Sequence, residues 1–229
     1  MTIYNWGMII KGVIFDFNGT LFWDTNLHNL AWDYFLEKKG IKISDKEKNE
    51  KIHGKNNQYI LKALFPYQLS TEDIDRFSIE KESIYQELCL QTNMQLAPGA
   101  VPFLQFLKDL KIPFTIATAS DAFNVDFYFK HLNLNPFFNR TTVIFNDLKI
   151  MSKPDPQIYL KAMDILGLKG YETLVFEDSV SGITSAENAG AAKIIIVDSN
   201  DDDYCRWNYQ IIKNFMEVDK KLFIQDNAV

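Results

Sequence analysis

The chain has 229 residues, of which 47% are hydrophobic and 24% are charged, and its formal net charge is −6. This length favours a main domain with a smaller insertion. The acidic balance argues against broad nucleic-acid binding, which needs a basic face. The short apolar segment Met8-Ile9-Ile10 stops at Lys11, so it is too short for a signal-peptide core or a membrane span. Cys89 and Cys205 have no metal-binding or redox spacing, which favours free thiols in the cytoplasm.

Residues 9–17 form the first expected strand. Its centre, Val13-Ile14-Phe15, is a continuous apolar run that leads to Gly19, as is typical of a strand buried on both faces. A carboxylate in such a place is costly unless it has a partner, and open α/β sheets bind ligands at the carboxyl ends of their strands. Asp16 is therefore the first candidate for chemistry, although it could also cap the turn at Gly19.

Residues 24–94 contain no clear strand. The spacing of apolar residues predicts helices over about 26–39, 44–52, 59–65 and 70–92, with stops at Gly40 and Pro66. We therefore expect an all-helical domain inserted after the first strand, with residues 1–23 and 95–229 forming the main domain.

Strands and helices alternate after residue 95. We expect strands at 113–118, 142–145, 173–176 and 193–197, and helices at 100–110, 121–132, 154–166 and 179–189, with a short terminal helix at 209–215. This alternation predicts a Rossmann-like α/β fold: a parallel sheet with right-handed crossovers and helices on both faces. The run Asp201-Asp202-Asp203 is interpreted as a solvated loop.

Further candidate residues follow the expected strands. Thr118 ends an apolar run, Lys153 lies in Ser152-Lys153-Pro154-Asp155-Pro156, and the pair Glu177-Asp178 follows Leu174-Val175-Phe176. Each also has an ordinary interpretation, because threonines are common at strand ends, lysines are common on surfaces and acids often cap helices. This ordinary interpretation is weaker for the acidic pair, since it would face the same sheet edge as Asp16.

These segments, in this order, resemble the motifs of the haloacid dehalogenase-like hydrolase superfamily. Asp16-Phe17-Asn18-Gly19-Thr20 resembles its first motif, Asp-x-Asp-x-Thr, and the resemblance spans roughly residues 13–198. The chain is most similar to the branch of phosphatases and β-phosphoglucomutase-like proteins with a helical cap. The resemblance implies hydrolysis of a small phosphorylated metabolite through an aspartyl-phosphate on Asp16. A monomer is the working expectation for the oligomeric state.

The resemblance also implies roles for the other residues. Asp16, Asp178 and the backbone carbonyl of Asn18 would bind Mg²⁺, with Glu177 acting indirectly or through water. Lys153 would neutralise the phosphate and the nucleophile. Thr118 and the backbone of Ala119 would donate hydrogen bonds to phosphoryl oxygens.

The main departure from the superfamily is Asn18, because relatives carry there a second aspartate that protonates the leaving group and then activates water. Asparagine has no proton to exchange, so three readings follow: a slow phosphatase, another proton-transfer group, or binding without efficient turnover. An introduced substitution is a further alternative. His28 is the candidate replacement, although it could instead position the Asn18 region through a hydrogen bond.

The cap offers a second departure. Lys55 lies where β-phosphoglucomutase-like caps carry Gly-x-x-Arg, and the arginine position is Asn57. A bidentate arginine suits a second phosphate, so phosphatase is favoured over phosphomutase. Dehalogenase chemistry is less favoured, because the metal-binding acids are present.

Overall fold

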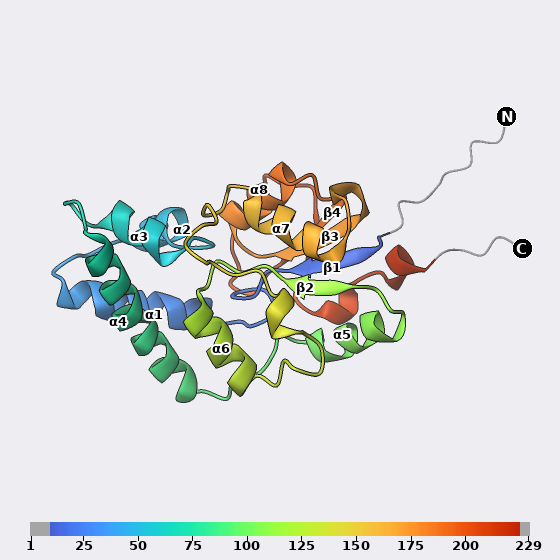
Figure 1. Ribbon diagram of the computed structural model, residues 1–229, viewed down its shortest axis with the longest axis horizontal. Coiled ribbons are helices and arrows are strands. Elements are labelled where there is room, and N and C mark those ends of the chain that lie inside the picture. The colour runs from blue at the N-terminus through green and yellow to red at the C-terminus, as the bar shows by residue number, and fades with distance from the viewer. Residues whose placement is uncertain (1–9, 225–229) are drawn as a thin grey trace, which may run out of the picture.

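A computed structural model describes residues 10–224 of the chain (Figure 1). Five parallel strands form one sheet in the order β2-β1-β3-β4-β5. The strands are β1 (Gly12–Phe15), β2 (Phe114–Ile116), β3 (Thr173–Glu177), β4 (Lys193–Val197) and β5 (Gln210–Ile212). The expected α/β class is therefore confirmed. Ile9, where we expected the first strand to begin, lies outside the described residues.

Helices cover both faces of this sheet. In Figure 1, α7 (Gln157–Leu166) and α8 (Val180–Asn188) lie on one side, and α5 (Ala100–Asp109) and α6 (Ala122–His131) lie on the other. Successive strand residues alternate between two buried clusters, so that Phe15 and Phe176 pack on the α5 side while Ile14 and Val175 pack on the α7 side. Continuous apolar runs follow from this burial on both faces.

The segment between β1 and α5 folds into four helices with a hydrophobic core of their own. These are α1 (Thr25–Lys38), α2 (Asp45–Lys51), α3 (Asn57–Leu64) and α4 (Thr71–Leu90). Trp32, Phe35 and Phe77 belong to a buried cluster that is separate from the two clusters of the sheet. Ser44 and Asn56 cap α2 and α3 by accepting backbone hydrogen bonds. This four-helix unit lies to the left of the sheet in Figure 1.

Two predictions of secondary structure are wrong. The expected strand at 142–145 is instead a 3₁₀ turn, Arg140–Thr142, followed by an isolated bridge between Ile144 and Ala117. Asn139 caps that turn, so the segment bends before a ladder can form. The expected helix at 209–215 is strand β5 followed by the 3₁₀ turn Phe215–Glu217, because pairing with β4 decides the conformation of a short apolar run.

The segment that carries Lys153 also differs in detail. Helix α7 begins at Gln157 rather than Pro154, with Pro156 at its N-cap position. Among residues 10–224, no helix combines the length and the apolar character that a membrane crossing requires.

Candidate active site

Asp16 directly follows β1 and lies at the centre of a buried ion-pair cluster. Its backbone N–H donates to the carbonyl of Phe176 at 3.0 Å, which joins it to the neighbouring strand. The ammonium of Lys153 lies 2.5 Å from Asp16 Oδ1 and also donates to Glu177. Burial raises the pKa of Asp16 to about 7, although the charge of Lys153 opposes this shift. Burial opposes the charge of Lys153, but its two carboxylate partners outweigh this and raise its pKa.

Glu177 holds Lys153 in place by accepting its hydrogen bond. Its Oε1 accepts from Lys153 and, at 2.8 Å, from the Tyr159 hydroxyl. Its Oε2 accepts from the backbone N–H groups of the next two residues, each at 2.9 Å, and from the Ser179 hydroxyl. A Cβ at Gly182 would lie 1.6 Å from Oε1, so only glycine leaves space for this carboxylate beside α8. These contacts occupy both oxygens of Glu177, which supports an indirect role toward a metal.

Three carboxylates gather beside the end of β1. Asp16, Glu177 and Asp178 each offer an oxygen, and these oxygens all lie within 4.8 Å of one another. Thr20 donates to Asp178 Oδ1 at 3.1 Å, and a Cβ at Gly19, whose φ is +77°, would lie 2.1 Å from Asp178 Oδ2. Burial and the neighbouring carboxylates raise the pKa of Asp178. A divalent cation with a preference for oxygen fits this donor set and would remove the repulsion.

The Asn18 side chain is fixed by hydrogen bonds at both ends of its amide. Its Nδ2 lies 2.7 Å from Asp24 Oδ2 and 2.7 Å from the Tyr128 hydroxyl. Its Oδ1 accepts from Ser120 at 2.7 Å and from Thr118 at 3.3 Å. The carboxylate of Asp24 can only accept, so these partners fix which end of the amide is nitrogen.

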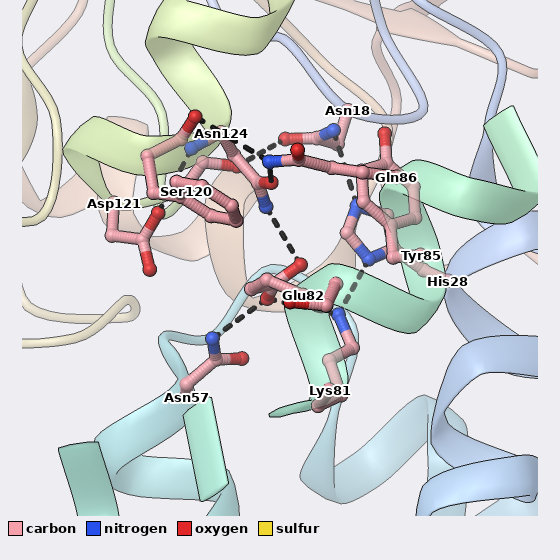
Figure 2. Close-up of polar contacts among 12 residues, drawn as sticks. Asn18, His28, Asn57, Lys81, Glu82, Tyr85, Gln86, Ser120, Asp121 and Asn124 are labelled. Atoms are coloured by element: carbon pink, nitrogen blue, oxygen red, sulfur yellow. Dashed lines mark hydrogen bonds and ion pairs between the residues drawn. The ribbon is translucent and has the colours of Figure 1, made fainter. Parts of the chain in front are cut away.

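His28 reaches the same network from helix α1. Its Nε2 lies 3.2 Å from Asn18 Nδ2 and 3.4 Å from Asp24 Oδ2, while its Nδ1 lies 2.8 Å from the ammonium of Lys81 (Figure 2). An ammonium can only donate, so Nδ1 accepts and Nε2 carries the proton of the neutral ring. The ring also stacks on Tyr85 with 3.8 Å between centroids. This environment supports positioning rather than proton transfer by His28.

One cavity lies between the sheet and the four-helix unit. It brings together seven of the residues that the sequence singled out: Asp16, Asn18, His28, Lys55, Thr118, Ala119 and Asp178. Lys153 and Glu177 are almost completely buried and do not line this cavity; Lys153 contacts Asp16, and Glu177 contacts Lys153. The candidates predicted from the sequence thus fall into two groups: seven residues that line the cavity, and two buried residues, Lys153 and Glu177, that lie behind it.

Several cavity residues were not anticipated, among them Ser120, Lys81 and Glu82. Lys81 did carry a signal in the sequence: it lies four residues from both Phe77 and Tyr85, on the apolar face of α4, where a charged residue needs a partner. Ser120 carried none, because its role depends on an approach to Asn18 across 102 residues of chain.

The chain resembles known proteins in sequence and in structure. Residues 10–190 match the haloacid dehalogenase-like hydrolases. The chain belongs to this family. Its match includes Asp16, Lys153 and Asp178 and ends at Gly190, just after α8.

Relatives described as phosphatases and as a phosphomutase resemble the chain. A protein from Drosophila melanogaster described as a probable pseudouridine-5′-phosphatase is 31% identical over 201 residues, which cover 81% of this chain and 80% of the relative. The β-phosphoglucomutase of Bacillus subtilis is 26% identical over 187 residues, covering 79% and 80%. The crystal structure of a family IA, variant 3 hydrolase from Entamoeba histolytica has a TM-score of 0.83 and 34% identity, covering 93% and 97% of the two chains.

Proposed function

We propose that the protein is a Mg²⁺-dependent phosphatase that hydrolyses a small phosphorylated sugar through an aspartyl-phosphate on Asp16. The observation that carries this proposal is the position of Asp16, which lines the cavity while its Oδ1 is held by buried Lys153. Relatives described as phosphatases support the reaction class. We further propose that residues 24–94 act as a cap over the main domain. Because both cysteines are free thiols, we also propose that the protein functions in the cytoplasm.

In the proposed first step, a carboxylate oxygen of Asp16 attacks phosphorus and the bond to the leaving oxygen breaks. Lys153 holds the carboxylate in place and balances its charge. The Thr118 hydroxyl and the backbone N–H of Ala119 would bind the phosphoryl oxygens. A Mg²⁺ ion bound by Asp16, Asp178 and the backbone carbonyl of Asn18 would supply charge neutralisation, with Glu177 reaching it through water.

Asn18 would slow both steps. It can hydrogen-bond the leaving oxygen but cannot give it a proton, so esters with good leaving groups should react best. In the second step it cannot take a proton from water, so the aspartyl-phosphate should persist. We expect His28 to position Asn18 indirectly, because its Nε2 faces Asp24 Oδ2, the oxygen that accepts from Asn18 Nδ2.

Phosphomutase activity is the second candidate, since β-phosphoglucomutase is among the relatives. Asn57 opposes it, because this side chain donates to Glu82 at 2.6 Å and offers no positive charge to a second phosphate. Binding of a phosphorylated ligand without turnover is the third reading, and Asn18 is the residue that favours it.

Phosphate release from a panel of phosphoesters, with and without Mg²⁺, tests the proposal. We expect Mg²⁺-dependent turnover that is fastest for p-nitrophenyl phosphate and is abolished in Asp16→Asn. Asp126→Asn, which alters an exposed carboxylate on α6, is the matched control. Binding of phosphate esters with no turnover of any of them would replace the phosphatase assignment with the binding reading.

A further inference from the structure

The cavity has a polar wall built from both sides of the cleft. Glu82 on α4 lies in this wall, with 4% of its side chain exposed. Its Oε1 accepts from Asn57 at 2.6 Å and from Lys81 at 3.0 Å, and its Oε2 accepts from Asn124 of α6 at 2.7 Å (Figure 2). Oε2 therefore retains capacity for one more donor. Burial opposes ionisation of Glu82, but these partners outweigh it and lower its pKa.

Asp121 adds a second carboxylate to the wall from the main domain. It is the N-cap of α6, and its Oδ1 accepts from the backbone N–H of Asn124 at 3.0 Å. Figure 2 shows the other oxygen turned away from that contact, with no interaction drawn to it. Burial and, next, the charge of Glu82 raise the pKa of Asp121. Asp121 and Glu82 thus both line the cavity, and the negative charge of each opposes that of the other.

The cations of the same cavity offset Glu82 more than Asp121, because Lys81 pairs with Glu82 while Asp121 forms no ion pair within residues 10–224. Lys81 donates to Glu82 and to His28, and its ammonium lies 5.0 Å from the ring of Trp32. Lys55 is partly buried, which lowers its pKa, and its ammonium lies 4.9 Å from the Tyr59 ring. Neither lysine is placed as a bidentate grip for a second phosphate.

We propose that Asp121 and Glu82 form a distal subsite that accepts hydrogen bonds from the hydroxyls of an uncharged polyol and disfavours a second anionic group on the substrate. The proposal rests on the proposed function, because it places the reacting phosphate at Asp16. It narrows the substrate to a monophosphate of a neutral sugar or polyol, since carboxylate oxygens accept from hydroxyls and repel a phosphate.

Equilibrium binding separates this subsite from turnover. The Asp16→Asn protein is titrated in Mg²⁺ with glucose 6-phosphate, glucose 1,6-bisphosphate and inorganic phosphate, and again with Asp121→Asn or Asp126→Asn added. Asparagine at 121 can keep the N-cap of α6, so the helix should persist. Asp126 lies on the same helix but is 68% exposed and pairs with Arg140, so it controls for charge alone.

We expect glucose 6-phosphate to bind about tenfold more tightly than the bisphosphate, because a second anion near a partly screened carboxylate costs on the order of one decade in affinity. Asp121→Asn should remove most of that preference, and Asp126→Asn should change it less than twofold. Tighter binding of the bisphosphate, or equal binding of glucose 6-phosphate and inorganic phosphate, would overturn the subsite. Phosphate release by the unsubstituted protein tests the proposed function separately.

Discussion

Replacement of Asn18 by aspartate isolates the largest departure of this chain from its family. The change restores a titratable group where Nδ2 now lies 2.7 Å from Asp24 Oδ2. A hydrogen bond is thereby replaced by two carboxyls in contact, and like charges this close cannot both ionise. The introduced carboxyl should therefore keep its proton at neutral pH, in the form that a general acid needs.

The magnitude follows from this contact. Keeping a carboxyl with an ordinary pKa near 4 protonated at pH 7 costs about 4 kcal/mol. Because the folded-state pKa is raised, the variant should match the native protein below about pH 4 and lose stability as the pH rises through the folded-state pKa. General acid catalysis is worth about 10²–10⁴ in rate, so sugar phosphate hydrolysis should rise by about a hundredfold.

Urea unfolding from pH 4 to 8 measures the stability part, and phosphate release measures the rate. A sugar phosphate should gain more than p-nitrophenyl phosphate, whose leaving group needs no proton. Asn139→Asp, a change at an exposed cap, is the control and should alter neither rate. A folded Asn18→Asp protein with no gain, or with equal gains on both esters, would refute the reasoning.

Three further predictions concern the buried support of the site and the two free thiols. Lys153→Met should lower the free energy of unfolding, measured in urea, by about 3–5 kcal/mol, because it leaves two buried carboxylates without a cation. Mg²⁺ should restore part of this stability. Gly182→Ala should lower the melting temperature and activity together, since its methyl group overlaps Glu177, whereas Val180→Ala on the same helix should not. Cys89 is buried and its pKa is raised to about 12, so a thiol reagent at pH 8 should modify only Cys205 until the protein unfolds.

The sequence predicted the strands that carry the site because burial on both faces leaves continuous apolar runs. Asp16 and Asp178 could be placed together for the same reason, since parallel strands end at one edge. The segments at 142–145 and 209–215 were misassigned, because short apolar runs have no period that distinguishes a strand from a helix or a turn. Pairing with distant residues decides them, as in the contact of Ile212 with Val197.

The surroundings of Asn18 were less accessible to sequence reasoning. Ser120 and Tyr128 reach its amide from residues more than a hundred positions away. Asp24 is close in sequence, but the turn that brings its carboxylate onto Asn18 leaves no pattern of its own. The same holds for Glu82 and Asp121, which line one cavity only when the four-helix unit packs on the main domain.

Trapping the covalent intermediate tests the central claim most directly. The protein is incubated with Mg²⁺ and p-nitrophenyl phosphate, quenched in acid within the first turnover, and mapped by peptide mass spectrometry. We expect one phosphoryl group on Asp16 that persists because Asn18 cannot activate water, with none in Asp16→Asn or without Mg²⁺. Phosphate release that continues in Asp16→Asn, or a phosphoryl group on another residue, would contradict the account.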